Sequence, residues 1–371
     1  QLQHITYEGQ LSLKTQKVKD VIERIGHQNP ELVKPALGPK DPWAYRNKMQ
    51  MPVGGSKGDI QMGFYAMGSH DIVQGTNCPI QDEGNNIIAQ ACYQIAKEFD
   101  IEPYNEHTGK GILRHVIGRI GQSGWMIILV TATDHLPHQE KWVEKLTERI
   151  PQVETIVHNV NNKRTNVILG SKNHILYGDG TITDHIKDLQ FTLSPHSFFQ
   201  VNPEQTTVLY DQALAYADLK GDETVIDAYC GTGTISLFLA HKAKHVIGIE
   251  IVEPAIINAR ENAQRNGYDN TEFIVADAAV EMPKLYKAGV RPDVIVFDPI
   301  RAGCKEEVLT SAAGMEPKRI VYVSCNPATM ARDIEILTHY GYELQEVQPV
   351  DMFPMTAHVE AVALLTRSEA M

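Results

Sequence analysis

The chain has 371 residues, of which 43% are hydrophobic, and its 34 basic and 46 acidic side chains give a formal net charge of −12. This composition excludes an intrinsically disordered protein, and no window approaches the roughly 18 uninterrupted apolar residues of a membrane helix. The acidic balance argues mildly against a nucleic-acid partner, although a local basic surface matters more than net charge.

The first half of the chain, to about residue 190, shows no regular alternation of strands and helices. Apolar residues at helical spacing over Leu11–Ile25 predict an amphipathic surface helix, with Lys14 and other basic residues away from the apolar side. Short apolar runs between glycine-rich turns then predict several strands and two more helices. The strands are expected at Tyr45–Val53, Gly63–Met67, His115–Ile120, Trp125–Thr131, Thr155–Asn161 and Asn166–Leu169, and the helices at Glu83–Phe99 and Gln139–Ile150. This pattern favours an antiparallel α+β domain.

From Thr224 onward, short apolar runs alternate with helical patterns, which is typical of a doubly wound parallel sheet. Strands are expected at Thr224–Ala228, His245–Glu250, Glu272–Ala276, Asp293–Phe297 and Arg319–Ser324, and helices at Thr234–Lys242, Val252–Asn266 and Ala328–Leu337. Such sheets bind ligands at the carboxyl ends of their strands, so the residues that follow each run are candidates for function.

A glycine-rich turn, DAYCGTGT, follows the first of these strands. Gly231 and Gly233 allow a tight turn and a close approach to a ligand. A dinucleotide fingerprint would have a third glycine where the chain has Ser236, so a nucleoside cofactor without a pyrophosphate, S-adenosylmethionine, fits better. Glu250 ends the next strand, where a carboxylate can accept the ribose hydroxyls, and Asp277 ends the third, within reach of an adenine edge. A structural turn with solvated acids is the alternative.

Reactive side chains follow the later strands. Asp298 opens a turn that lacks the aromatic residue typical of amine methyltransferases. Cys325 ends the fifth strand and is a candidate nucleophile, and the helix starting near Ala328 is expected to lower its pKa. Glu360 enters the last strand, where a carboxylate needs a task or a partner. It is a candidate base, with His358 as the alternative.

The segments DAYCGTGT, DPIRAGC, VYVSCNPATMARD and DMFPMTAHVEAVALL, with FFQVN upstream, resemble the bacterial RNA uracil-5-methyltransferases, and most closely those acting on 23S ribosomal RNA. The resemblance covers nearly the whole chain, including YRNKMQMPV. It implies that Cys325 adds to uracil C6, that Glu360 removes the C5 proton, and that Asp298 lies near the target base. The residues expected to bind the cofactor are Gln200, Tyr229, Gly231, Gly233, Thr234, Glu250, Asp277 and Asp298. Those expected to bind the substrate are Phe198, which stacks on the extruded base, and Arg46, Lys48 and Arg301.

The chain departs from the family pattern in three places. Ile300 replaces the proline or alanine of the usual DPPR or DPAR turn, which leaves the geometry of that loop open. The family's small basic barrel is missing, and of its four iron–sulfur ligands only Cys78 has a match, so no metal cluster is expected. The chain opens with neither an initiating Met nor a signal peptide, which suggests a piece of a longer protein.

These observations predict an α/β protein with two domains. Residues 1–190 are expected to form an α+β RNA-binding domain, whose helix near residues 11–25 could pack on the catalytic domain, and residues 191–371 a Rossmann-like methyltransferase domain. The expected protein is a monomer with no membrane contact. Its five cysteines include no C-x-x-C pair, which favours the reducing cytoplasm as its location. Three other activities stay open, namely uracil-5 methylation of transfer RNA, cytosine-5 methylation through Cys304 or Cys325, and RNA binding without catalysis.

Overall fold

The computed structural model describes residues 1–368, and these form two compact units. One unit is Trp43–Val201, and the other combines Gln1–Pro42 with the chain from Asn202 onward. This division differs from the expected one, which kept residues 1–190 together. None of the helices within residues 1–368 has the length and apolar character that crossing a membrane requires.

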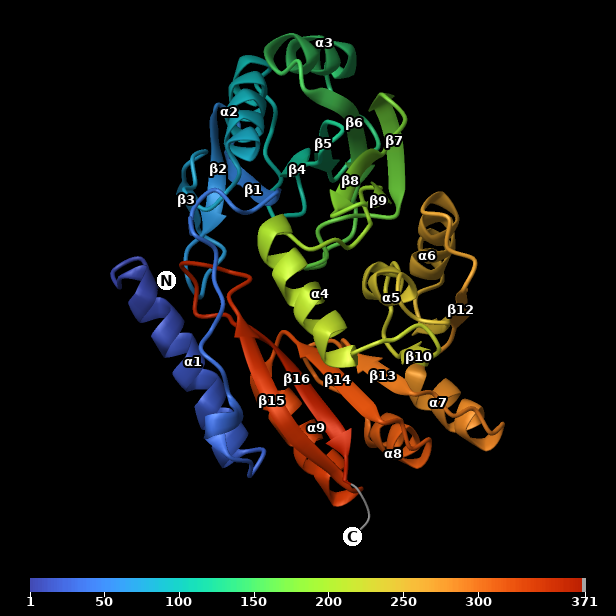
Figure 1. Ribbon diagram of the computed structural model, residues 1–371. Coiled ribbons are helices and arrows are strands. Elements are labelled where there is room, and N and C mark those ends of the chain that lie inside the picture. The colour runs from blue at the N-terminus through green and yellow to red at the C-terminus, as the bar shows by residue number, and fades with distance from the viewer. Residues whose placement is uncertain (369–371) are drawn as a thin grey trace. The chain divides into compact units, whose positions relative to one another are not determined.

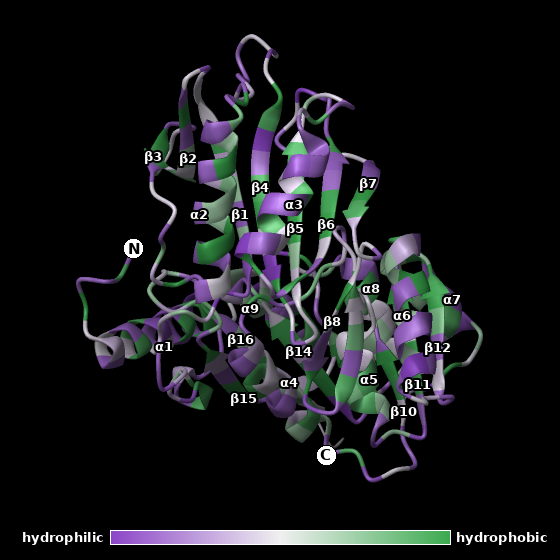
Figure 2. Cartoon of the chain, turned by 90° about the horizontal axis from the view of Figure 1, so that it is seen from above, coloured by the Kyte–Doolittle hydropathy of each residue, from purple (hydrophilic) through white to green (hydrophobic). Residues whose placement is uncertain are grey.

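The unit Trp43–Val201 is built on a sheet of seven strands in the order β3-β2-β1-β4-β5-β6-β7. The strands are β1 (Lys48–Ser56), β2 (Asp59–Tyr65), β3 (Ile72–Gln74), β4 (Leu113–Ile120), β5 (Trp125–Thr131), β6 (Val153–Val160) and β7 (Lys172–Tyr177). The helices are α2 (Glu83–Glu98) and α3 (Gln139–Arg149), and a separate hairpin joins β8 (Ile182–Ile186) to β9 (Leu189–Leu193). Helix α3 buries only Trp142 and Leu146 and is mostly hydrophilic in Figure 2.

Two features of this unit differ from the sequence-based expectation. Strands β5 and β6 are parallel, because α3 carries the chain back across the sheet, so the sheet is mixed rather than antiparallel. No strand forms at Asn166–Leu169. Instead, Asn161 Nδ2 donates to the carbonyls of Val167 and Ile168, and these bonds hold the segment as a loop before β7.

The other unit contains a sheet in the order β12-β11-β10-β13-β14-β16-β15, in which β16 runs opposite to the other six strands (Figure 1). Its strands are β10 (Thr224–Asp227), β11 (His245–Glu250), β12 (Thr271–Val275), β13 (Val294–Phe297), β14 (Arg319–Ser324), β15 (Tyr342–Val350) and β16 (Glu360–Arg367). Its helices are α1 (Tyr7–Arg24), α4 (Pro203–Ala217), α5 (Thr234–Ala240), α6 (Glu253–Arg265), α7 (Ala278–Lys287), α8 (Glu306–Gly314) and α9 (Pro327–His339), with a short 3₁₀ turn at Pro30–Leu32. This is the expected doubly wound architecture.

Both faces of this sheet are covered by helices, which explains why the middle positions of its central strands are apolar on both faces. Ile226, Ile295 and Ile320 alternate with equally buried valines, because successive side chains of a strand point to opposite faces. The isoleucines join one core with residues of α1, α8 and α9. The chain therefore presents its polar residues where the strands end rather than along them.

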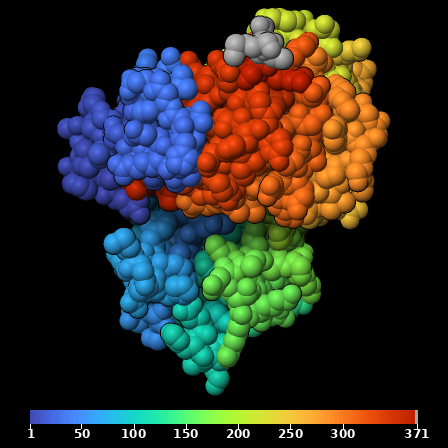
Figure 3. Space-filling model, turned by 90° about the horizontal axis from the view of Figure 1, so that it is seen from below, coloured from blue at the N-terminus to red at the C-terminus, as the bar shows by residue number. Residues whose placement is uncertain are grey.

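Residues 1–42 join this unit through α1 and the segment that follows it (Figure 3). The helix starts at Thr6, whose hydroxyl accepts from the amide of Gly9, and it buries a stripe at four-residue spacing, namely Gln10, Lys14, Val18 and Ile22. Val18 and Ile22 enter the main core. Residues Val33 and Leu37 then pair with β15 through isolated bridges.

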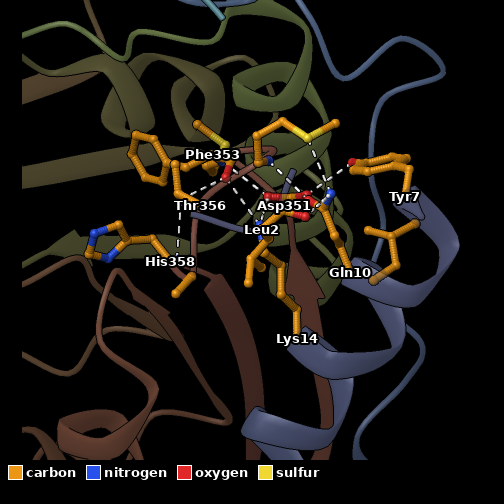
Figure 4. Close-up of polar contacts among 12 residues, drawn as sticks. Leu2, Tyr7, Gln10, Lys14, Asp351, Phe353, Thr356 and His358 are labelled. Atoms are coloured by element: carbon orange, nitrogen blue, oxygen red, sulfur yellow. Dashed lines mark hydrogen bonds and ion pairs between the residues drawn. The ribbon is translucent and has the colours of Figure 1, made fainter. Parts of the chain in front are cut away.

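The polar half of that stripe binds the loop between β15 and β16 (Figure 4). Lys14 and Asp351 are 2% and 0% exposed and form an ion pair of 2.5 Å, and the Tyr7 hydroxyl donates to the other Asp351 oxygen at 3.0 Å. Gln10 exchanges hydrogen bonds with Met355, accepting from its amide and donating to its sulfur. The sequence placed Lys14 away from the apolar side of the helix, but the structure buries it in the same stripe as Val18 and Ile22. Its partner Asp351 lies more than 300 residues away in the chain, so local spacing could not indicate the pair.

Candidate active site

The parallel strands of the second unit end at one edge of the sheet, and the predicted site residues follow them. Strand β10 has β11 on one side and β13 on the other, so the direction of the chain connections reverses beside it. Ligands of doubly wound sheets bind in the crevice at such a switch point. The glycine-rich turn follows β10, Asp298 follows β13, and Cys325 follows β14.

Cys325 and Glu360 meet because β14 and β16 are antiparallel neighbours. The last pair of this ladder is Ser324 with Ala361, so one further step of the register sets Cys325 opposite Glu360. Burial raises the pKa of Cys325, and the Glu360 and Asp298 carboxylates raise it further. The thiol and both carboxyl groups therefore lie close enough to interact.

Three carboxyl groups gather at this edge: Asp227, the last residue of β10, with Asp298 and Glu360. Burial raises the pKa of Asp227 to about 6 and that of Glu360 to about 7, and these side chains are 0% and 5% exposed. Burial raises the pKa of Asp298 well above its usual range, and the other two carboxyl groups add to that rise. The edge is therefore a cluster of buried carboxyl groups, and a bound cation would favour their ionised forms.

The glycine-rich turn needs its glycines for backbone reasons. Gly231 and Gly233 have φ angles of 54° and 81°, in the left-handed region that favours glycine. Glu250 is held beside the turn, because one carboxylate oxygen accepts from the amide of Gly231 at 3.2 Å and the other from Val252 at 2.9 Å. Thr234 begins α5, and its hydroxyl lies 3.2 Å from the hydroxyl of Tyr210.

Tyr229 lies inside the same turn, and its hydroxyl faces Cys304: burial raises the pKa of Tyr229, and Cys304 raises it further. Asp277 has a structural role, since one of its oxygens caps α7 through the amide of Ala279 and the other binds Lys305 at 2.8 Å. Its contact with the cofactor remains a prediction.

The loop 298–304 is tied to α9, the helix that follows Cys325. The carbonyl of Arg301 accepts from Asn326 Nδ2 at 2.9 Å and from the hydroxyl of Thr329 at 3.2 Å. Asp333 holds the end of the loop by accepting from the amide of Cys304 at 2.7 Å. The positive charge of Arg301 acts on Cys325, whose pKa it lowers against the larger effects of burial and the carboxylates. Ile300, at the tip, is 77% exposed.

The remaining predicted residues belong to the unit Trp43–Val201. Phe198 is 72% exposed and Gln200 is half-buried, both in the coil after β9. Arg46 and Lys48 are half-buried at the start of β1. Cys78 is half-buried beside α2, and its amide donates to Asn86 Oδ1. Across residues 1–368, no three His, Cys, Asp or Glu side chains are grouped as metal ligands would be.

The chain is similar to known methyltransferases over its whole length. The family described as tRNA (Uracil-5-)-methyltransferase matches residues 126–368. An RNA methyltransferase of Bacillus cereus is 53% identical over 371 residues, which are 100% of this chain and 81% of that protein, and one of Clostridium acetobutylicum is 50% identical over 99% of this chain and 81% of its own. This chain belongs to the RNA uracil-5-methyltransferase family.

A solved structure agrees with this membership. The tRNA (uracil-54, C5)-methyltransferase of Pyrococcus abyssi, in complex with S-adenosyl-L-homocysteine, superposes with a TM-score of 0.80 at 28% identity, covering 98% of this chain and 85% of that one. The predicted family, the Rossmann-like fold, the RNA methyltransferase activity and the S-adenosylmethionine cofactor are thereby confirmed. The reading as an RNA-binding protein without catalysis is wrong.

The acidic edge of this uracil-5-methyltransferase fits its cofactor. S-adenosylmethionine carries a sulfonium and an ammonium group, and Asp227 presents a fully buried carboxylate oxygen, Oδ1, that has no hydrogen-bond partner. A buried acceptor without a donor is costly unless a ligand supplies one. Sequence reasoning missed Asp227, although its position as the last residue of β10 was the available signal.

One expectation about this site is wrong. The start of α9 was expected to lower the pKa of Cys325, yet that pKa is raised. Burial removes the thiolate from water, and Glu360 and Asp298 place negative charge beside it. The helix end therefore does not dominate the pKa of the thiol, and the charge of Arg301 only partly offsets burial and the two carboxylates.

Proposed function

We propose that this enzyme methylates C5 of a uridine in 23S ribosomal RNA by covalent catalysis through Cys325. The observation that carries the proposal is the register of β14 and β16, which sets a thiol opposite a buried carboxyl group. One group can then add to the pyrimidine ring while the other removes its proton. Uracil C5 is too weak a nucleophile to be methylated without such an addition.

The Cys325 thiolate forms a bond to C6, and the electrons of the C5–C6 double bond move to the C4 carbonyl as an enolate. The enolate makes C5 nucleophilic, and S-adenosylmethionine would supply the methyl group and leave as S-adenosyl-L-homocysteine. Glu360 then takes the proton from C5, the C5–C6 double bond reforms, and the C6–sulfur bond breaks to release the thiolate. Asp298 lies beside both side chains and is assigned to orient the base.

The pKa of Glu360 supports its role as the base. A general base is most effective when its pKa is close to the working pH, and burial holds the pKa of Glu360 at about 7. His358 is the alternative, but its side chain is exposed on the loop before β16. Partial desolvation and the positive charge of Arg301 lower its pKa.

The other predicted residues take roles around this reaction. We assign cofactor binding to Tyr229, Gly231, Gly233, Thr234, Glu250, Asp277 and Gln200. We assign substrate binding to Phe198, Arg46, Lys48 and Arg301. An aromatic ring as exposed as Phe198 is free to stack on an extruded base, which recovers part of the few kcal/mol that extrusion costs.

The mechanism is tested with RNA that carries 5-fluorouridine at the target position. Fluorine cannot leave as a proton, so Cys325 stays bonded to C6 after methyl transfer. We expect a protein–RNA adduct that survives denaturing electrophoresis, requires S-adenosylmethionine and disappears in Cys325→Ser. Absence of an adduct, while ordinary RNA is still methylated, would exclude covalent catalysis.

The choice of RNA rests on the motif resemblance, which favours 23S ribosomal RNA. The Pyrococcus relative acts on uracil-54 of transfer RNA, which makes transfer RNA the second candidate. Mapping 5-methyluridine in both RNAs from cells with and without the gene separates the two, since the substrate RNA alone loses a methyl group. We further infer a monomer that works in the cytoplasm, which sedimentation of the purified protein and cell fractionation test.

A further inference from the structure

Three cationic side chains of the unit Trp43–Val201 lie together at one end of β1 and β4. Lys48 and Arg119 are direct partners in the antiparallel ladder of these strands, and Arg46 precedes Lys48 by two residues. Like charges placed directly opposite each other destabilise a sheet. The arrangement therefore costs folding free energy.

Burial makes this arrangement more costly. Arg119 is 3% exposed; its Nη2 donates to the carbonyl of Ser197 at 2.7 Å, and its Nη1 has no partner. Burial lowers the pKa of Arg119 to about 10 and, with the charges of Arg119 and Arg46, lowers that of Lys48 to about 8. A buried donor that is charged and unpartnered is among the most expensive groups in a protein.

Within the part of the chain that the structure describes, no ion pair joins Arg46, Lys48 or Arg119 to an acid. Asp184 is the acid whose negative charge reaches Arg119, and burial raises the pKa of that carboxyl group. His196, which Lys48 influences, adds no negative charge.

We propose that Arg46, Lys48 and Arg119 form a cradle for one phosphodiester group of the substrate RNA, with the free Nη1 of Arg119 at its buried end. Arg46 and Lys48 were expected to contact RNA, whereas Arg119 is a new member of the site. The inference rests on the proposed RNA substrate. A guanidinium suits this task because its planar donors match phosphate oxygens in pairs.

The same arginine links the cradle to Phe198. Its Nη2 holds the carbonyl of Ser197, so the backbone next to Phe198 is anchored to β4 through the side chain that would bind the phosphate. Phosphate binding is thereby coupled to the placement of the ring proposed to stack on the extruded base. Contacts to the RNA backbone set register in just this way, without reading sequence.

The first test is the salt dependence of RNA binding. Lys48→Met and Arg119→Gln should each weaken binding about 3- to 10-fold near physiological salt and flatten the slope of log K against log salt by about 0.7–0.9. Lys141→Met removes an equal charge from an exposed position on α3 and serves as the control. Slopes of both cradle variants equal to that of Lys141→Met would overturn the proposal.

The second test separates a binding role from a structural one. Removing Lys48 relieves repulsion with Arg119, so Lys48→Met should melt at or above the temperature of the wild type without RNA. Inorganic phosphate should raise the melting temperature of the wild type and have less effect on Lys48→Met. The opposite result would be a Lys48→Met variant that melts below the wild type and whose melting temperature phosphate raises by the same amount. That result would mean that Lys48 has a structural role.

The third test distinguishes RNA from a free anion. Neutral methylphosphonate links are placed one at a time along the substrate RNA. We expect one position to weaken wild-type binding and to leave binding by Arg119→Gln unchanged. If no position does so while phosphate still stabilises the wild type, the site binds a free anion and the RNA assignment fails. Binding is measured without S-adenosylmethionine, so failure of the proposed methylation would show separately, as no methyl transfer to any RNA.

Discussion

Each of the two units gathers ionisable groups of one kind, acidic in one unit and basic in the other. The sheet edge that carries Cys325 gathers three carboxyl groups, whereas the end of β1 and β4 gathers three cations. Each set costs stability in the free protein, and each suits a ligand of the opposite charge. The positive groups of the cofactor suit the acidic edge, and a phosphate of the RNA suits the basic cradle. This chain therefore keeps ionisable groups of one kind together at the two places where we propose that ligands bind.

The Lys14–Asp351 pair shows the alternative arrangement. Both side chains are buried, yet they neutralise each other and also bond to Tyr7 and to the carbonyl of Phe353. No ligand is needed there, and the pair attaches α1 to the loop that precedes Glu360. A buried charge that is paired within the chain has a structural role, and the unpaired ones mark function.

The largest effect is expected from Cys325→Ala. Methyl transfer should be abolished, because no other group can add to uracil C6, while affinity for S-adenosylmethionine changes little, because the thiol contacts the base. Turnover and calorimetric binding measure these two quantities. Cys92→Ala, a buried thiol of the other unit, is the control and should remain active. An active Cys325→Ala would break the assignment of the acidic edge to catalysis.

Glu360→Gln should slow turnover about 10²–10⁴-fold, since an amide cannot accept the C5 proton. Addition and methyl transfer should still occur, so a methylated protein–RNA adduct accumulates with ordinary RNA. Denaturing electrophoresis and mass spectrometry detect it, and the double variant with Cys325→Ala should lack it. Slow turnover without an adduct would place the base elsewhere, with His358 next to be changed.

Lys14→Met should destabilise the protein by about 3–5 kcal/mol, because Asp351 is left buried and unpaired. Denaturant titration measures the free energy of unfolding, and adding Asp351→Asn should restore part of the loss. Lys19→Met on the same helix breaks an exposed ion pair with Glu31 and should cost no more than about 1 kcal/mol. Equal decreases in the free energy of unfolding for the two lysine variants would show that the buried ion pair stabilises the protein no more than the surface ion pair does.

The smallest effect is a dependence of stability on pH. The folded pKa of Glu360, about 7, exceeds the ordinary value of 4.5, so the folded state binds the extra proton between these values. Stability should therefore fall as pH rises from about 4.5 through 7, by on the order of 3 kcal/mol for this group. The Glu360→Gln variant should lack this part of the decrease in stability with pH. In the wild type, S-adenosylmethionine should make the decrease smaller. A decline unchanged in the variant would assign it to other groups.

Local patterns predicted much of the catalytic unit. The strands His245–Glu250 and Arg319–Ser324 have the expected bounds, because continuous apolar runs between turns leave few alternatives. Gly231 and Gly233 indicated a tight turn from their residue type alone. The expectation for residues 166–169 failed, because side-chain bonds from Asn161 hold that apolar segment as a loop.

The sequence by itself determined which reactive groups this protein has and where they stand along the chain: Cys325 and Asp298 after strands, and Glu360 at the start of one. Only the tertiary structure decided what surrounds them. The pKa of Cys325 is raised rather than lowered because antiparallel pairing and burial bring carboxyl groups from distant strands to one thiol. The burial of Lys14 and the pairing of Lys48 with Arg119 arise in the same way. Electrostatic energies depend on distances in space and on exclusion of water, and neither follows from the spacing of residues in a sequence.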